Sequence, residues 1–253
     1  MRKLLFVLIV QLLFLCQQTF AQDTLDSIAK VQTMVQIEEF NLILELGLDS
    51  SENYSEKLDS MAKSGNPAAQ NKLSICYIDG LGIPKDDKKA FFWATKAAEN
   101  GNLKALHLLG FCYENGKGTE PDPFQAFSFY KIAALRGMPT AFNDLAQCYL
   151  NGTGTPVDSI KARAWFVKGA ETGIRTSQTN AGYLYIALEG HENYEKAFYW
   201  LSKASEQNSP NALEMLGMCY ENGWGTEVNL PKAQECYRKS YQLGNEYAKS
   251  RIK

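Results

Sequence analysis

The stretch that decides the fold reads Leu109-Gly110-Phe111-Cys112-Tyr113-Glu114-Asn115-Gly116-Lys117-Gly118. Its pattern returns at a nearly fixed spacing along the chain. One marker residue opens each unit, and successive markers are 36, 36, 36, 35 and 36 residues apart: Gly65, Gly101, Gly137, Gly173, Asn208 and Gly244. A period between about 20 and 50 residues is typical of repeat architectures. The sequence therefore predicts five copies of one structural unit.

Each unit is predicted to form two helices joined by a glycine turn. Small or apolar residues at the fourth, fifth, eighth, eleventh and twelfth positions after the marker share one face of a first helix. A small residue at the ninth position, such as Gly110, lets the partner helix approach closely. A Gly-x-Gly pair follows, for example Gly116 and Gly118, and its recurrence after a helix favours a turn over a phosphate-binding loop.

The second helix is expected to begin at an N-cap residue four positions before an alanine that every unit keeps. These caps are Asp86, Asp122, Asp158, Asn193 and Asn229. Each second helix then carries an adjacent pair that is aromatic in four units: Phe92 and Trp93, Phe129 and Tyr130, Trp165 and Phe166, and Tyr199 and Trp200, with Cys236 and Tyr237 in the last unit. The fourth unit is one residue short and keeps only Gly190 of its turn, so we expect its turn geometry to differ.

These motifs resemble the Sel-1-like repeat, a relative of the tetratricopeptide repeat, over residues 65–248. The stretches 109–118 and 161–170 carry the likeness most clearly. The resemblance implies an all-α fold, a right-handed α-solenoid of stacked antiparallel helix hairpins whose members usually act as interaction scaffolds. We expect the five repeats at 65–100, 101–136, 137–172, 173–207 and 208–243, preceded by a divergent N-terminal helical half-unit at 22–64 and followed by a capping helix at 244–253.

Residues 1–21 have the layout of a secretory signal peptide. Arg2 and Lys3 precede an apolar run that ends at Cys16, and a small-residue cleavage site ends at Ala21. A retained membrane anchor is the weaker interpretation because the run is short, and Leu15 before Cys16 disfavours lipid attachment at that cysteine. We therefore expect an exported protein, periplasmic or secreted, without stable membrane insertion once the signal is removed.

Composition excludes several classes of protein. The 253 residues include 45% hydrophobic and 21% charged residues, which is enough apolar material for a packed core and unlike a disordered chain. Basic residues (26) nearly balance acidic ones (28), so the basic footprint of a nucleic-acid partner is missing. His107 and His191 belong to no nucleophile or metal motif. We predict no catalytic residue, no cofactor and no metal site.

Four cysteines recur at one position of their units: Cys76, Cys112, Cys148 and Cys219. Adjacent helices lie about 8 to 10 Å apart, whereas bonded cysteines need Cα atoms within about 7 Å. The fourth unit places Leu184 at the same position, which favours core packing. A disulfide inside the last hairpin, between Cys219 and Cys236, stays open as an alternative.

A second stripe on the first helices, at the sixth and tenth positions, marks the candidate peptide-binding surface. In tetratricopeptide-like solenoids, which this chain resembles, that stripe lines the concave groove. The sixth position holds Asn71, His107, Asn143, Thr179 and Glu214, and the tenth holds Ile75, Phe111, Gln147, Tyr183 and Met218. Amides beside aromatic and apolar groups suit an extended peptide. The alternative is ordinary solenoid surface with some packing between neighbouring first helices.

The sequence thus predicts an exported, non-enzymatic scaffold whose groove binds an unidentified protein or peptide. The resemblance implies one alternative from another class, a cell-wall-associated member that binds peptidoglycan or a β-lactam or hydrolyses it weakly. The residues themselves supply no catalytic constellation for that activity.

Overall fold

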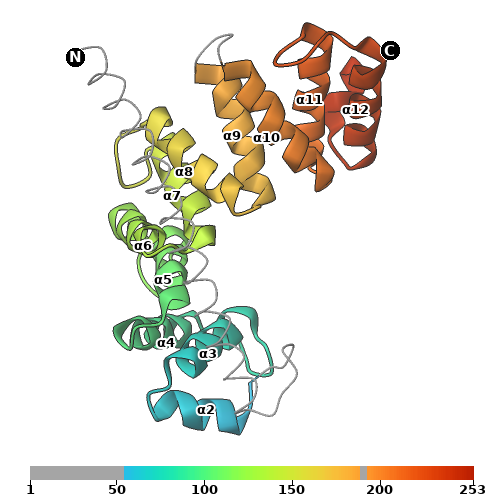
Figure 1. Ribbon diagram of the computed structural model, residues 1–253. Coiled ribbons are helices and arrows are strands. Elements are labelled where there is room, and N and C mark those ends of the chain that lie inside the picture. The colour runs from blue at the N-terminus through green and yellow to red at the C-terminus, as the bar shows by residue number, and fades with distance from the viewer. Residues whose placement is uncertain (1–53, 189–192) are drawn as a thin grey trace, which may run out of the picture. The chain divides into compact units, whose positions relative to one another are not determined.

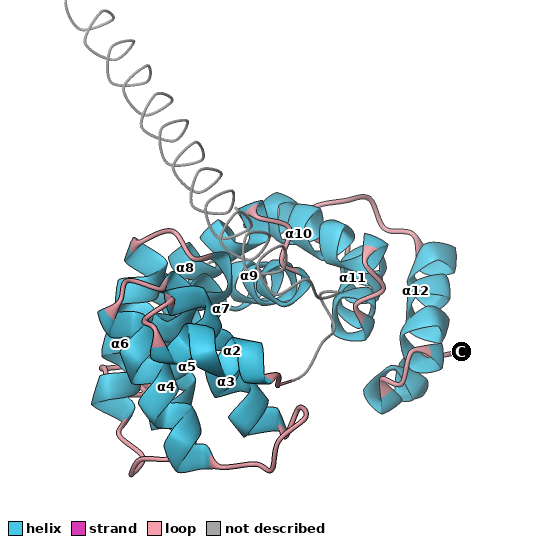
Figure 2. Ribbon diagram, turned by 90° about the horizontal axis from the view of Figure 1, so that it is seen from below, coloured by secondary structure: helices cyan, strands magenta, loops and turns pink. Residues whose placement is uncertain are grey.

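The computed structural model describes residues 54–188 and 193–253, and every regular element in these ranges is helical (Figures 1 and 2). The expected signal peptide at 1–21, residues 22–53 of the expected half-unit, Gly190 and His191 lie outside the described residues. None of the described helices combines the length and apolar character needed to cross a membrane.

The helices alternate as the two-helix unit requires. The first helices of the five repeats are α3 (Pro67–Asp79), α5 (Leu103–Asn115), α7 (Pro139–Asn151), α9 (Arg175–Leu188) and α11 (Pro210–Asn222). The second helices are α4 (Asp87–Glu99), α6 (Pro123–Leu135), α8 (Ser159–Glu171), α10 (Tyr194–Glu206) and α12 (Leu230–Gln242). Helix α2 (Glu56–Lys63) precedes them, and the 3-10 helix η2 (Glu246–Arg251) follows where a capping helix is expected.

The chain forms two compact units. The first comprises the described residues up to Pro121 together with Leu135–Met138, and the second comprises Asp122–Ala134 and Pro139–Lys253. In the first unit α2 packs on α3, α3 on α4 and α4 on α5. In the second, each helix from α7 to α12 packs on its successor, and η2 packs on α12. Consecutive helices therefore form stacked hairpins, and the predicted all-α solenoid class is confirmed.

In the first, fourth and fifth repeats, the small residue at the ninth position brings the two helices of the hairpin together, as predicted. A Cβ atom added at Gly182 would lie 2.6 Å from Cγ of Leu201, and one added at Gly217 would lie 2.5 Å from Cε1 of Tyr237. In the first repeat the hydroxyl of Ser74 donates a hydrogen bond of 2.6 Å to the carbonyl of Ala90. Larger side chains at these positions would force the helices apart.

Four of the five expected N-caps hold the start of a second helix. The carboxylates of Asp86 and Asp158 and the amide oxygen of Asn229 each accept a hydrogen bond from the backbone N–H three residues later, at 2.9 to 3.0 Å. Asp122 accepts from the N–H groups of Phe124 and Gln125. These bonds satisfy donors that a helix start leaves without an intrahelical partner.

Asn193 stands at the N-cap position of α10, as predicted, but its side chain makes no capping hydrogen bond to that helix. Its backbone has φ −114° and ψ 5°, whereas Asp86 is extended at φ −151° and ψ 95°. A cap side chain reaches the helix start from an extended backbone. The fourth repeat has one residue fewer than the others between its marker and this helix.

The Gly-x-Gly pairs are turn residues, as predicted, and the second glycine also contacts the preceding repeat. Gly152 ends α7 with φ +74°, a left-handed conformation that glycine adopts without a steric penalty. A Cβ atom at Gly154 would collide with the carbonyl oxygen of Pro123, the first residue of α6, and one at Gly225 with that of Tyr194, the first residue of α10. The turn of each of these repeats therefore rests on the start of the previous second helix.

Candidate peptide-binding surface

The tenth-position row is the more accessible part of the predicted groove stripe. In the second unit it consists of Gln147 on α7, Tyr183 on α9 and Met218 on α11. Half of the Tyr183 surface (50%) is exposed, while the other two side chains are half-buried. Helices α9 and α11 are in contact, so Tyr183 and Met218 lie on adjacent helices. This row presents aromatic, apolar and amide groups along the first helices.

The first unit holds the remaining tenth-position residues. Ile75 on α3 and Phe111 on α5 are both half-buried. Each therefore keeps part of its apolar surface exposed, which an apolar side chain of a ligand would remove from water.

The sixth-position row has a second use that the sequence analysis missed. The hydroxyl of Thr179 lies 3.0 Å from that of Ser209, the N-cap of α11. The carboxylate of Glu214 accepts a hydrogen bond of 2.7 Å from the side chain of Asn245, the N-cap of η2. Ser209 and Asn245 stand at the start of the element that follows the next marker residue, so these bonds join one repeat to the next.

Asn143 continues this pattern, since its amide oxygen accepts a hydrogen bond of 3.3 Å from the hydroxyl of Ser177 on α9.

In the first unit Asn71 is 7% exposed, and its Oδ1 accepts no hydrogen bond from a described residue. His107 is half-buried. Polar residues recurring directly after the marker, such as Asn102 and Asn245, were the available signal for these bonds between repeats.

At the C-terminal end of the stripe, charged side chains pair with one another. The guanidinium of Arg251 lies 3.7 Å from a carboxylate oxygen of Glu214 and 3.8 Å from one of Glu221. The hydroxyl of Tyr237 donates a hydrogen bond of 2.7 Å to Glu221. Burial, together with this carboxylate, raises the pKa of Tyr237 well above its ordinary value. Glu214 is therefore held by Asn245 and Arg251 and is poorly placed to bind a ligand.

The cysteines pack in the core, in line with the prediction, and the structure supplies no reactive thiol there. Cys76, Cys112, Cys148 and Cys219 are buried, and all five described cysteines, Cys236 included, are free thiols. Burial raises the pKa of Cys112 to about 11 and that of Cys219 to about 12. At neutral pH such thiols stay protonated, and a thiol must ionise to act as a nucleophile or a metal ligand. Within the described residues no group of three or more His, Cys, Asp or Glu side chains could hold a metal ion.

The family comparison agrees with the repeat pattern. The Sel1 repeat model matches five segments of the chain, which together span most of the described residues: 67–102, 103–138, 141–173, 176–209 and 210–245.

Two solved structures of bacterial proteins are similar over most of this chain. One is a protective antigen present in uropathogenic Escherichia coli strains, which displays an SLR fold (TM-score 0.73, 27% identity, 78% of this chain and 42% of that one). The other is a Sel1 repeat protein from Oxalobacter formigenes (TM-score 0.67, 29% identity, 77% of this chain and 56% of that one). This chain thus spans about half the length of each.

A curated relative shares a shorter segment. DAP3-binding cell death enhancer 1 of Rattus norvegicus is 42% identical over 67 residues, which are 26% of this chain and 13% of the relative. Its Mus musculus counterpart is 34% identical over 65 residues, again 13% of its own length. The likeness to these relatives is limited to a small part of their sequences.

Proposed function

Because the chain belongs to the Sel1 repeat family, we propose that it is a non-enzymatic scaffold that binds an extended protein segment on its first helices. The tenth-position row of α7, α9 and α11 is the binding surface in the second unit. The rat relative is named for binding another protein, DAP3, which supports a protein rather than a small metabolite as the ligand class.

The exposed ring of Tyr183 carries this proposal. It stands on α9, 50% exposed, and half-buried Met218 stands on the adjacent helix α11. Aromatic residues at such positions supply a large contact area with little loss of side-chain freedom, and they dominate the energetics of many interfaces. The sixth-position groups of the second unit, Asn143, Thr179 and Glu214, are bonded between repeats, and they act by keeping the first helices in fixed register.

A matched pair of variants tests the surface. Affinity capture with the full chain, followed by mass spectrometry, identifies a ligand, and the affinity of that ligand is then measured with Tyr183→Ala and with Tyr199→Ala. Tyr199 is 53% exposed but stands on the second helix α10. We expect Tyr183→Ala to weaken binding at least tenfold and Tyr199→Ala to leave it unchanged, with equal helicity by circular dichroism. Equal effects of the two variants would place the site elsewhere.

Export is a further part of the proposal. It is supported by the charged start, apolar run and small-residue site of residues 1–21. Expression of the full chain with mass measurement of the exported product tests it, and a first residue of Gln22 is the expected result. Retention of the full-length mass in the cytoplasmic fraction would refute export without touching the binding proposal.

An enzyme assay addresses the rival class. Purified protein is expected to leave a chromogenic β-lactam and labelled peptidoglycan unhydrolysed, because the sequence contains no recognisable nucleophile motif. Turnover that survives purification and disappears in His107→Ala would contradict the scaffold proposal.

A further inference from the structure

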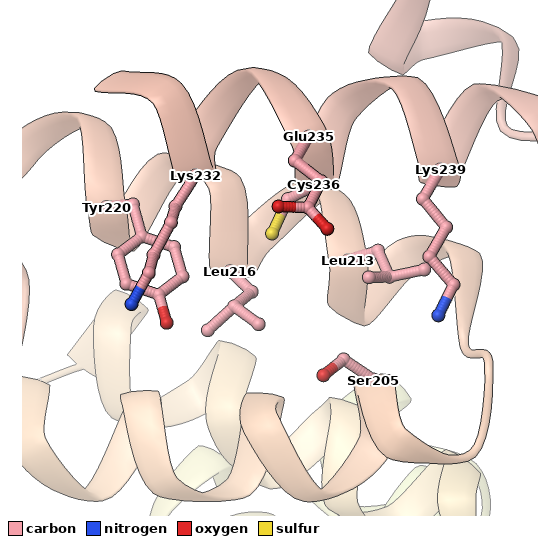
Figure 3. Close-up of a pocket in the computed structure, with 8 residues that line it drawn as sticks. All are labelled: Ser205, Leu213, Leu216, Tyr220, Lys232, Glu235, Cys236 and Lys239. Carbon is pink, nitrogen blue, oxygen red and sulfur yellow. The ribbon is translucent and has the colours of Figure 1, made fainter. Parts of the chain in front are cut away.

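The last repeat contains a cavity that lies away from the first-helix row. Its volume is about 260 Å³, and α10, α11 and α12 line it (Figure 3). Leu213, Leu216 and Cys236 give it an apolar wall, and the sulfur of Cys236 points into it. Pockets for drug-sized ligands measure about 300 to 1,000 Å³. This cavity therefore has room for a single ring system.

The cavity lies where the other repeats carry an aromatic ring. The position of Cys236 corresponds, at intervals of 36, 36, 35 and 36 residues, to Trp93, Phe129, Trp165 and Trp200. In the third repeat the ring of Trp165 stacks on that of Phe142, with centroids 5.8 Å apart. Both residues are replaced in the last repeat, where Leu213 stands 71 positions after Phe142 and Cys236 stands 71 after Trp165. Smaller side chains thus leave the space of the stacked pair partly empty.

The cation that covers the ring is nevertheless retained. In the third repeat Nζ of Lys168 lies 4.4 Å from the centroid of the Trp165 ring. Lys239 stands 71 positions later and lines the cavity. A lysine ammonium over an aromatic face is attracted by the ring quadrupole, most strongly over tryptophan. The third repeat therefore shows how the corresponding site looks when an aromatic ring fills it.

The charges at the cavity indicate which kind of residue should stand next to the aromatic ring of a ligand. Lys232 and Lys239 contribute two positive charges, and Glu235 contributes one negative charge. Nζ of Lys232 also lies 5.3 Å from the centroid of the Tyr220 ring, which holds it beside the cavity. An acidic residue next to the ring would meet an excess of positive charge.

We propose that this cavity binds the side chain of a tryptophan in a protein partner, with an adjacent acidic residue of that partner paired to the lysines. The ring occupies the place that Trp165 fills in the third repeat, and Lys239 covers it as Lys168 covers Trp165. The thiol of Cys236 stays protonated, since burial raises its pKa to about 11. Its contact with the ring is therefore a packing contact.

This site is independent of the proposed groove. Its lysines, Glu235 and Cys236 stand on the second helix α12, and its wall residues Leu213 and Leu216 share α11 with Met218, but Tyr183 stands on α9 and does not line it. Tyr183→Ala is therefore expected to leave the cavity site unchanged, and the variants described below are expected to leave groove binding unchanged. Failure of one proposal does not imply failure of the other.

Blocked peptides test the site directly. Acetyl-Asp-Trp-Asp-amide and acetyl-Asp-Ala-Asp-amide are titrated into the full chain under reducing conditions and followed by NMR. We expect the tryptophan peptide to bind at least tenfold more tightly and to shift the signals of Leu213, Leu216 and Cys236. Equal binding of the two peptides would overturn the proposal. So would indole binding as tightly as the tryptophan peptide, because the acidic neighbour would then contribute nothing.

Two variants complete the experiment. Cys236→Trp fills the cavity with the ring of the other repeats and should lower the affinity at least tenfold without lowering the melting temperature. Lys239→Gln should lower it about fivefold, while the matched Lys168→Gln in the filled third repeat should not. If Cys236→Trp fails to fold, the comparison of Lys239→Gln with Lys168→Gln tests the site without it. Equal effects of these two variants on the affinity would refute the site. A dimer that Cys236→Trp dissociates would assign the cavity to a second copy of the chain and refute the proposal.

Discussion

The third and the last repeats have the same hairpin but different interiors. Asp158 and Asn229 cap their second helices in the same way, and Gly152 and Gly223 end their first helices in the same left-handed conformation. The third repeat nevertheless stacks Trp165 on an aromatic neighbour, whereas the last repeat has Cys236 beside a cavity. The comparison indicates that caps, glycines and small residues specify the backbone of the repeat. The large side chains are free to vary and give a repeat its own surface.

The largest effect is expected from a charge placed in the shared core. Leu145 in the third repeat is fully buried, and Leu216 is its counterpart in the last. Leu145→Asp should cost about 3 to 5 kcal/mol, because it leaves a buried group without a partner. The third repeat has a neighbouring repeat on each side, so we expect Leu145→Asp to unfold the neighbouring repeats as well. Circular dichroism should show a greater loss of helix for Leu145→Asp than for Leu216→Asp, and equal losses would contradict nearest-neighbour stacking.

The glycine turn is expected to be equally strict in both repeats. Gly154→Ala would add a Cβ that collides with Pro123 in a backbone of φ +65°, and Gly225→Ala would collide with Tyr194 at φ +70°. Each should cost about 3 kcal/mol, of which a left-handed alanine alone accounts for about 1 to 2. Gly173→Ala is the control, because its φ is +86° but its Cβ would meet open space. Urea unfolding should rank Gly173→Ala as the mildest of the three.

Truncation to alanine at the Trp165 position should destabilise the third repeat more than the equivalent truncation at Cys236 destabilises the last repeat. Trp165→Ala takes away a ring that packs on the buried Phe166 cluster and on Phe142, and we expect a loss of about 3 kcal/mol. Cys236→Ala removes one sulfur beside an existing cavity and should cost about 1 kcal/mol or less. Thermal unfolding of both variants measures the difference. Similar melting temperatures would mean that the third repeat is packed no better than the last.

The smallest effect is a dependence of stability on alkaline pH. Burial raises the pKa of Cys219 from 9.0 to about 12, so the thiol is protonated in both states below pH 9. Above pH 9 only the unfolded thiol ionises, and stability falls as pH rises toward 12, by about 1.4 kcal/mol per pH unit at most. At pH 10 the loss should be about 1 kcal/mol. In urea unfolding between pH 8.5 and 10.5, the free energy of unfolding should fall less steeply with pH in Cys219→Ala than in the parent protein. Equal slopes in the two proteins would contradict this prediction.

Much of the fold follows from the sequence because it depends on residues with one physical role. A glycine with positive φ, a cap such as Asp158 and a small residue such as Gly217 each have few substitutes, so they recur visibly. Asn193 shows the limit of such patterns. Its residue type suits a cap, but its backbone is not extended and its side chain makes no capping hydrogen bond.

The candidate site was less predictable for a different reason. Position on a helix face indicated where Thr179 and Glu214 lie, but their hydrogen bonds go to the next repeat, 30 and 31 residues along the chain. A periodic pattern within one unit does not reveal partners in another. The cavity at Cys236 had a visible signal, a break in the aromatic series, but its volume depends on how closely three helices approach.

In the second, third and fifth repeats, the contact between the glycine turn and the start of the preceding second helix gives the array a direction. Gly118, Gly154 and Gly225 each rest on residues nearer the N-terminus. A ribosome releases the chain in that same order, so a newly made hairpin meets a surface that is already complete. Folding can therefore keep pace with translation, one hairpin after another.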